Sequence, residues 1–554
     1  MKQPSRFRPT PVIVMTTLFL AGAPFPAGSA LFKSAQPVWP EGRETEKNLS
    51  VGFRAAFTPK PGQRVLLRAT GSTIYRVWLN GQFLAHGPAR GPHGFFRVDE
   101  IDLTERLLSR TNLVAVEVAG YNANSYALLD QPSFLQAEVV AEGRVLASTG
   151  GEGTPFEALV LKERVQKAQR YSFQRPFAEV YRLQPGGDAW RREASAPIEP
   201  VAVALQPAKV FLPRRVPHPD YAMRPPVTLV SRGTLKTGVK VDKPWKDRAL
   251  TTIGLQLGGY PESELAAIPS LELQTVANDH TTPLSRAFAQ DMALELKAAE
   301  FGILDFGCNL TGFLGAKVVC EQPTRLFFTF DEILRNGDVD WKRLGCVNIV
   351  SYELASGTYD LESFEPYTLR YLKLLVLDGG CRITRPYLRE FANPDASRAH
   401  FAASDERLNR LFTAGRETFR QNAVDIFMDC PSRERAGWLC DSFFTARVAQ
   451  DLCGNATVER NFLENFALPP KFAHLPDGML PMCYPADHND GVFIPNWAMW
   501  FVLQLEEYSE RCGDRELVEA LRPRVLKLLD FFKRYRNADG LLEKLPSWVF
   551  VEWS

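Results

Sequence analysis

The chain has 554 residues, of which 45% are hydrophobic and 23% charged, as expected for a soluble globular protein with several separate cores. Its formal net charge of +1 at pH 7 gives no reason to expect nucleic acid or an anionic membrane as a partner. The length is enough for about three to four domains.

An export signal is predicted at the N-terminus. A basic segment precedes an apolar stretch at residues 11–21, and Gly28-Ser29-Ala30 provides small residues for cleavage. The apolar stretch is shorter than the roughly 18 residues of a bilayer-spanning helix, so we expect no stable membrane insertion. We therefore predict that residues 1–30 are a cleaved signal peptide and that the protein is exported to the periplasm or the extracellular space. The alternative is an uncleaved membrane anchor.

Short alternating segments predict a β-sandwich over residues 31–205. Residues 64–69 and 73–79 alternate apolar and polar side chains, as strands with one buried face do. Asn80-Gly81 then supplies the two positions with φ > 0 that a type I′ hairpin turn requires. Strand signals at this spacing are typical of a sandwich or jelly roll. The run from Tyr75 to Leu84 also resembles the galactose-binding-like modules found beside many glycosidases.

A second β-sandwich is predicted over residues 206–400. A proline-rich passage at 207–226 marks the boundary between the two domains. Strand-like runs follow at 293–304, 313–320, 325–330, 347–354 and 372–377.

The pattern changes to helical periodicity after Ser404. Asp405 and Glu406 place carboxylates in the first turn, where they interact favourably with the helix dipole, and apolar residues then recur at helical spacing. The chain is therefore predicted to be multidomain, β then α, with two jelly-roll-like β-sandwich domains before a helical domain at 401–554. Further helices are predicted at 441–452, 456–467, 495–511 and 515–536.

The residues that carry chemistry gather in the segment from Asp429 to Asp441. These thirteen residues include two Asp, one Glu, two Arg and one Trp, and Pro431 and Gly437 interrupt any regular helix. Carboxylates transfer protons, guanidinium groups hydrogen-bond hydroxyls or carboxylates, and an indole packs on a sugar ring. A polar loop whose charges only pair with one another would have the same composition.

The same segment, DCPSRERxGWxxD, resembles the signature of the bacterial α-L-rhamnosidases of glycoside hydrolase family 78, which are six-hairpin glycosidases. The resemblance implies that Glu434 is the general acid and that Asp429 and Asp441 face the sugar. It gives Arg433 and Trp438 the role of supporting contacts. It further implies hydrolysis of terminal α-L-rhamnosyl linkages with inversion at the anomeric carbon.

Other passages extend this resemblance. Residues 305–312 (DFGCNLTG) and 364–374 resemble parts of the β-sandwich that precedes the catalytic domain in these enzymes. Pro495-Asn496-Trp497 resembles a further family segment, and Trp497 is predicted to stack on the sugar, with a place in the barrel core as the alternative. Residues 548–553 resemble a GDW segment in which Glu552 replaces the Asp. Glu552 is predicted as a substrate contact, or alternatively as a substitute base.

The resemblance also implies that residues 401–554 form the N-terminal part of an (α/α)6 barrel, although they hold fewer helices than such a barrel needs. In the family the general base is a Glu far downstream of the acid. We therefore expect the base to lie beyond Ser554 and the chain to be a truncated form, whose own activity is open. Two alternatives remain: another six-hairpin glycosidase with a different sugar, or a catalytically inactive carbohydrate-binding fragment.

The expected partner is a rhamnose-containing oligosaccharide, polysaccharide or glycoside. A neighbouring carboxylate disfavours a second negative charge and so helps to keep the acid protonated. The sequence has no His/Cys cluster with zinc-ligand spacing and no EF-hand-like loop, so we expect no cofactor and no metal. Its nine cysteines cannot all pair, and free thiols are expected rather than a bridge between Cys430 and Cys440.

Overall fold

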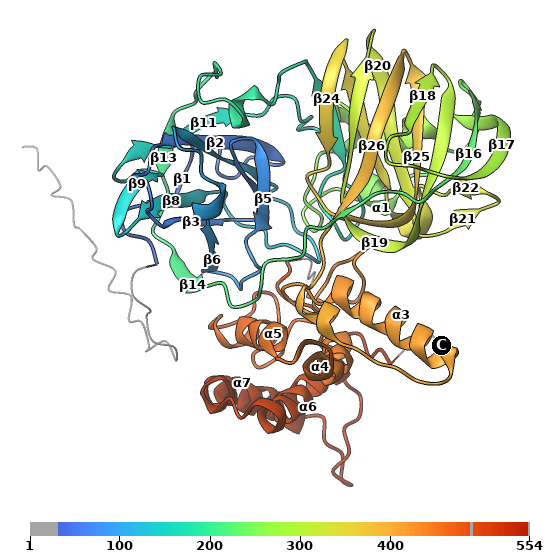
Figure 1. Cartoon of the computed structure of the whole chain (residues 1–554). Helices are drawn as coiled ribbons and strands as arrows, with labels where there is room; N and C mark the ends of the chain where they lie inside the picture. Colours follow the sequence, from blue (N-terminus) through green and yellow to red (C-terminus); the bar gives the residue numbers. More distant parts are fainter. Residues whose placement is uncertain (1–30, 488–490, 552–554) are drawn as a thin grey trace, which may run out of the picture.

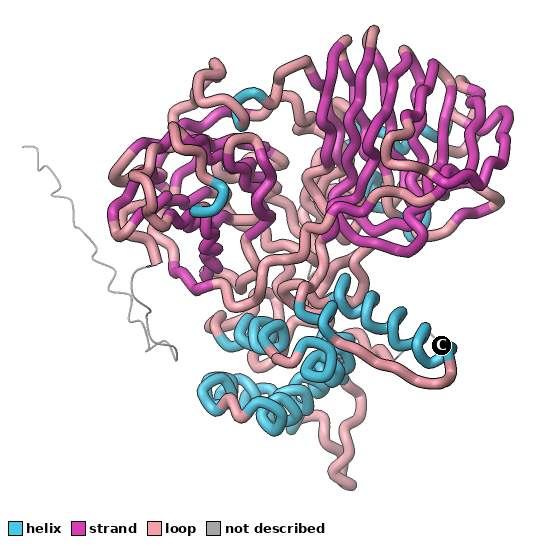
Figure 2. Tube along the Cα trace, viewed as in Figure 1, coloured by secondary structure: helices cyan, strands magenta, loops and turns pink. Residues whose placement is uncertain are grey.

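The computed structural model describes residues 31–487 and 491–551. Two strand-rich units stand next to each other, and the helices of the C-terminal part lie together below both (Figure 1). Figure 2 shows the same division by type of secondary structure, with the long helices confined to one region. Within the described residues, no helix combines the length and apolar character needed to cross a membrane. The predicted signal peptide at 1–30 lies outside the described residues, as does Glu552.

The first unit is a sandwich of an eight-stranded and a five-stranded sheet. The predicted hairpin turn is confirmed, because Asn80 and Gly81 have φ values of 53° and 78°. Side chains that alternate inward from both sheets build a core around Trp39, Phe53 and Tyr75, each of which is fully buried. The strands are β1 (Val38–Pro40), β2 (Leu49–Phe57), β3 (Val65–Gly71), β4 (Ile74–Leu79), β5 (Gln82–Gly87), β6 (Phe95–Asp102), β7 (Asn112–Gly120), β8 (Leu135–Ala141), β9 (Arg144–Ser148), β10 (Thr154–Pro155), β11 (Glu157–Val160), β13 (Val203–Leu205) and β14 (Val210–Pro213).

The second unit is built on an eleven-stranded sheet with a separate aromatic and aliphatic core. Its strands are β12 (Glu179–Leu183), β15 (Met223–Arg224), β16 (Thr228–Lys236), β17 (Ala277–Ala287), β18 (Ala293–Lys297), β19 (Glu300–Cys320), β20 (Thr324–Asp331), β23 (Ile349–Leu354), β24 (Gly357–Glu362), β25 (Tyr367–Asp378) and β26 (Gly380–Glu390), with β21 (Leu334–Arg335) and β22 (Asp338–Val339) forming a small hairpin. Two short helices, α1 (Arg248–Thr251) and α2 (Pro269–Gln274), lie in the connection from β16 to β17.

The two strand-rich units exchange strands, which corrects the predicted boundary at residue 205. Strand β12 precedes that boundary but pairs in parallel with β23 of the second sheet. Strand β14 follows the boundary but pairs in parallel with β6 of the first unit. The chain therefore crosses into the second unit and returns before it finally leaves the first, which no local sequence pattern reveals.

One long strand replaces two predicted ones. Strand β19 runs without a break through the DFGCNLTG passage, where its pairing with β25 shifts register between Asp305 and Leu310. Gly307, with φ of 82°, lies inside this irregularity, where a side chain would be strained. The predicted strand at 293–304 is instead divided at Ala299, whose φ is 58°.

The helical part begins with α3 (Glu406–Asn422), which Asp405 caps by accepting a hydrogen bond from the Arg407 amide. It continues with α4 (Leu439–Cys453), α5 (Thr457–Ala467), α6 (Pro495–Cys512) and α7 (Arg515–Lys533). Glycines with left-handed backbone, Gly454 and Gly513, end α4 and α6. The predicted order of β units followed by helices is confirmed.

Candidate active site

The loop between α3 and α4 (residues 423–438, called the acid loop below) contains most of the DCPSRERAGWLCD segment, whose last three residues begin α4. This loop pairs with a second loop. The Tyr484 amide donates to the Gly437 carbonyl (3.1 Å), and the Leu439 amide donates to the Met482 carbonyl (3.1 Å). A side chain at Gly437 would bring its Cβ to 2.4 Å from the Tyr484 carbonyl oxygen. Only glycine allows the two loops to approach this closely.

Glu434 is held at both carboxylate oxygens. Oε1 accepts a hydrogen bond from Arg433 Nη2 (2.6 Å), and Oε2 accepts one from the Trp438 indole Nε1 (2.8 Å). The side chain is 7% exposed. Two of the predicted supporting residues therefore fix the orientation of the predicted acid, at positions 1 before and 4 after it in the sequence.

Asp429 is a buried carboxyl of the loop whose acidity is altered. Burial, and then the nearby charge of Glu434, raise the pKa of Asp429 to about 7. Its Oδ1 accepts a hydrogen bond from the Ala436 amide (3.1 Å), which closes the loop on itself. Asp429 therefore carries a proton below about pH 7, so the raised pKa falls on Asp429, which is predicted as a sugar contact.

The charges of all three predicted acidic residues act on one buried thiol. Cys483 is buried, and its pKa is raised first by burial and then by the charges of Glu434, Asp429 and Asp441. Cys483 also forms a β-bridge with Trp438. Asp441 stands in the first turn of α4. The three acidic residues therefore lie near enough to Cys483 for their charges to raise its pKa, and their contact with a sugar stays a prediction.

The two predicted indole rings pack against each other. Trp438 and Trp497 meet edge to face, with ring centroids 5.5 Å apart, and both are less than a tenth exposed. Tyr126 from the first unit touches the other side of Trp438 at 5.6 Å, and Phe550 contacts Trp497 at 5.4 Å. Trp497 is part of the largest core cluster, and its stacking on a sugar stays a prediction.

A hollow of about 580 Å³ opens beside the loop. Its lining includes Asp429, Cys430 and Pro431 from the loop and Glu406 and Glu417 from α3. Asp429, but not Glu434, is part of this lining. A volume of several hundred Å³ suits one or two sugar rings.

Buried ion pairs hold this loop to the β units, and sequence reasoning missed them. Arg90 contacts Asp425 at 2.6 Å, and Glu365 accepts hydrogen bonds from Arg175 (3.1 Å) and Arg435 (3.2 Å). The only sequence feature near these pairs was the 364–374 passage. It contains Glu365 but does not indicate which residues pair with Glu365.

The described residues contain no group of three or more His, Cys, Asp or Glu side chains that could hold a metal ion. No bridge joins Cys430 and Cys440 in the described part of the chain. Two of the nine cysteines, Cys308 and Cys512, are exposed.

Residues 396–554 match the family model of the bacterial alpha-L-rhamnosidase six-hairpin glycosidase domain. No curated protein sequence matches the chain. Among solved structures, the GH78 rhamnosidase of Bacillus sp. GL1 superposes with a TM-score of 0.74 and 18% identity, covering 94% of this chain and 71% of that one.

Two longer enzymes superpose less closely. The α-L-rhamnosidase of Aspergillus terreus gives a TM-score of 0.58 at 17% identity, covering 92% of this chain and 53% of that one. The Streptomyces avermitilis α-L-rhamnosidase, solved with L-rhamnose, gives 0.57 at 17% identity, covering 89% and 42%. The chain thus spans about half, or less, of these two. The match to the bacterial α-L-rhamnosidase six-hairpin glycosidase domain covers the last 159 residues, and the chain as a whole has the fold of the family 78 rhamnosidases.

Proposed function

We propose that the protein is a glycosidase that cleaves terminal α-L-rhamnosyl linkages in an oligosaccharide, polysaccharide or glycoside. The observation that supports this proposal is that the charges of Asp429, Glu434 and Asp441 all act on the buried Cys483 thiol, in a segment that matches the rhamnosidase domain model. The proposal includes export of the protein through the signal at residues 1–30.

The proposed reaction inverts the anomeric carbon. A carboxylic acid gives its proton to the glycosidic oxygen as the bond from that oxygen to the anomeric carbon breaks. Water attacks the anomeric carbon from the opposite face and loses a proton to a second carboxylate about 6.5–9.5 Å from the acid. We propose that a carboxyl outside residues 429–441 provides this base. The products are free rhamnose and the alcohol.

The geometry divides the acid role between two candidates. Glu434 matches the family position, and its hydrogen bonds to Arg433 and Trp438 hold it in one orientation. Asp429 lines the open hollow, and its pKa of about 7 leaves it protonated in weakly acidic solution. We propose Glu434 as the donor and Asp429 as a sugar contact that hydrogen-bonds a hydroxyl.

The test is hydrolysis by the full-length protein of aryl α-L-rhamnosides with good and poor leaving groups. General acid catalysis contributes about 10²–10⁴-fold where the leaving group needs a proton. Glu434→Gln should therefore lose about that factor on phenyl rhamnoside but little on the 2,4-dinitrophenyl compound, while Asp429→Asn should weaken both alike. Glu516→Gln, an exposed change on α7, is the control.

The reverse pattern would transfer the acid role to Asp429. Full activity of Glu434→Gln on poor leaving groups would refute the acid assignment. Hydrolysis of other aryl glycosides in preference to rhamnosides would refute the proposed sugar.

A further inference from the structure

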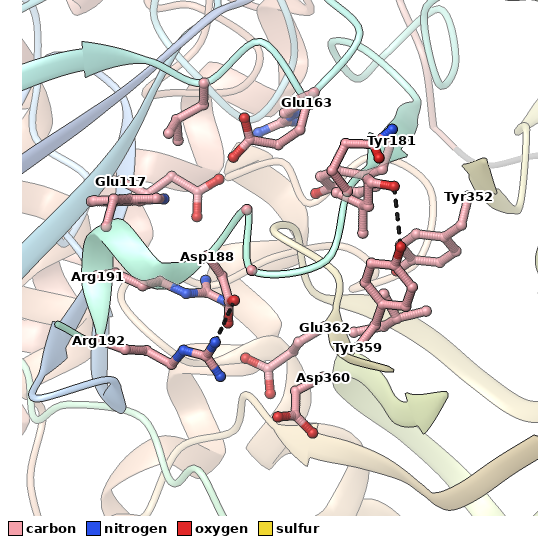
Figure 3. A pocket seen from close by; sticks show the side chains of 18 of the residues that line it. Glu117, Glu163, Tyr181, Asp188, Arg191, Arg192, Tyr352, Tyr359, Asp360 and Glu362 are labelled. Carbon is pink, nitrogen blue, oxygen red and sulfur yellow. Dashed lines mark hydrogen bonds and ion pairs between the residues drawn. The ribbon is translucent and has the colours of Figure 1, made fainter. Parts of the chain in front are cut away.

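A second cleft lies between the two strand-rich units, away from the DCPSRERAGWLCD loop. It has a volume of about 390 Å³, and none of its lining residues belongs to residues 401–551. Its lining comes from β4 and β7 of the first unit, from β23 and β24 of the second, and from the 184–188 turn. Figure 3 shows the labelled side chains of this lining. Gly186 in that turn has φ of 75°.

The lining carries many charges that balance. Five cationic and five acidic side chains face this cleft, so its net charge is zero. The cationic residues are Arg76, Arg164, Arg191, Arg192 and Lys317, and the acidic residues are Glu117, Glu163, Asp188, Asp360 and Glu362. Figure 3 shows most of the carboxylates and tyrosines distributed around one open space. Such an array offers donors and acceptors on every side and gives no net attraction to an anion or a cation.

Several polar groups of the lining have no partner in the protein. Arg76 Nε, Arg164 Nη1 and the Tyr352 hydroxyl are buried without a hydrogen bond, and the three residues are 3%, 4% and 2% exposed. The Glu163 carboxylate makes no hydrogen bond or ion pair with another residue in the described part of the chain. Burying unpaired polar groups is unfavourable, so a ligand that pairs with them gains free energy on binding.

Aromatic faces accompany the polar groups. Tyr181 and Tyr352 stack with ring centroids 5.3 Å apart and an interplanar angle of 11°. Trp190 and Tyr359 also line the cleft. Flat apolar rings next to hydrogen-bonding groups suit a sugar, which has C–H faces and a hydroxyl edge.

The cleft continues into a second hollow. A neighbouring space of about 760 Å³ shares Lys317 and Asp360 with it. These two residues are directly paired across β19 and β24, and both are exposed. The two hollows adjoin at this pair, and together, as the groove of the proposal below, they have room for more than one sugar ring.

We propose that this groove is a binding site for a neutral oligosaccharide. Hydroxyls of one sugar unit would pair with Arg76, Arg164 and Tyr352 at the floor of the cleft. Glu163 would accept a hydrogen bond from a further hydroxyl, and the next unit would extend over Lys317 and Asp360. The site binds without cleaving and does not depend on hydrolysis at Glu434.

The test is calorimetric titration of the full-length protein with three trisaccharide probes. The neutral probe is a trimer of α-L-rhamnose, the anionic probe is trigalacturonic acid, and the cationic probe is a trimer of glucosamine. We expect the neutral trimer to bind at least 10-fold more tightly than either charged one. A preference for a charged trimer, or no binding of the neutral one, would refute the proposal.

Variants then locate the binding. Tyr352→Phe removes a hydroxyl without a protein partner, so it should leave the melting temperature equal or higher while it weakens binding at least 5-fold. Glu163→Gln should weaken binding similarly, and the exposed Glu105→Gln should not. Unchanged affinity in both cleft variants would refute the site.

Glu434→Gln separates this inference from the proposed hydrolysis. The variant should bind the rhamnose trimer at the cleft as the unaltered protein does. Binding that is lost in Glu434→Gln but kept in Tyr352→Phe would place the ligand at the acid loop and overturn the inference. If Glu434→Gln loses hydrolysis but still binds the trimer at the cleft, the inferred binding site is supported.

Discussion

Arg90 of the first unit forms an ion pair with Asp425, which lies 335 positions later in the sequence and four residues before Asp429. Its Nε and Nη2 atoms both donate to the carboxylate, at a shortest distance of 2.6 Å. Its Nη1 atom donates to the Arg435 carbonyl (2.7 Å). One guanidinium from the β part therefore fixes two points of the acid loop.

Removing this contact should loosen the helical part. Breaking a buried ion pair leaves an uncompensated charge and costs about 3–5 kcal/mol. Arg90→Ala should therefore lower the urea concentration at which the helical part unfolds, by the shift that this loss of free energy produces. Lys162→Ala breaks the exposed pair with Glu199 and should leave the urea midpoint almost unchanged, because water and salt screen such a pair. Equal effects of the two variants would contradict the structural role of Arg90.

The same pair predicts a loss of stability in acid. Burial alone would raise the pKa of Asp425, but the charge and hydrogen bonds of Arg90 outweigh burial and lower it. A carboxyl with a depressed pKa stabilises the fold above its unfolded pKa of about 4 and loses that contribution as pH falls towards its folded value. Asp425→Asn should therefore flatten the decline of unfolding free energy below about pH 4, measured by urea titration at successive pH values.

Two glycines should respond to alanine in opposite directions. At Gly437 the new Cβ would meet the Tyr484 carbonyl oxygen at 2.4 Å, so Gly437→Ala should force the paired loops apart and cost about 1–3 kcal/mol. At Gly415 inside α3 nothing lies within 4 Å, so Gly415→Ala should stabilise the helix by up to about 1 kcal/mol. Thermal unfolding of both variants checks the prediction. Stabilisation by Gly437→Ala would show that the close approach of the two loops is not required.

Asp429 should make the protein less stable as the solution becomes neutral. Its pKa is about 7 in the fold, against about 4 in an unfolded chain, so the folded state binds more protons between these values. The free energy of unfolding should therefore fall as pH rises from about 4 to 7. Asp429→Asn should reduce this fall, by on the order of a few kcal/mol, and the exposed Asp451→Asn should not. An unchanged pH dependence in Asp429→Asn would show that this carboxyl has an ordinary acidity.

Trp438 should act on hydrolysis through Glu434. Trp438→Phe keeps an aromatic ring in the cluster but removes the indole N–H that donates to Glu434 Oε2. A misplaced acid slows the chemical step more than it weakens binding, so kcat should fall about 10–100-fold with little change in KM. Trp500→Phe, which alters a ring packed on Phe443 at 4.8 Å, is the matched control. A fall confined to KM would instead make Trp438 a ligand contact.

The sequence predicted those structural elements whose conformation depends on residues close together in the chain. Asn80-Gly81 determined a hairpin because its backbone preference acts within the turn itself. Apolar residues at helical spacing predicted α7, which ends at Lys533, three residues before the expected end. The acid loop was found because its functional side chains lie within thirteen consecutive residues.

Contacts between distant segments left no such signal. Nothing near Arg90 indicates Asp425, and nothing near Cys483 indicates the three carboxyls whose charges act on its thiol. The long strand β19 was missed for a different reason. The glycine and asparagine residues of its DFGCNLTG passage are typical of a loop. In the fold they occupy an irregular stretch of β19, and the neighbouring strands β25 and β26 together pair with β19 along its length.

The crossing of β12 and β14 between the two strand-rich units has a consequence for dissection of the molecule. A single cut at residue 205 would detach β14 from its partner β6 and leave β12 attached to the wrong fragment. The two units are therefore interlocked along the backbone. A deletion, fusion or domain exchange must keep both units together in one piece of chain.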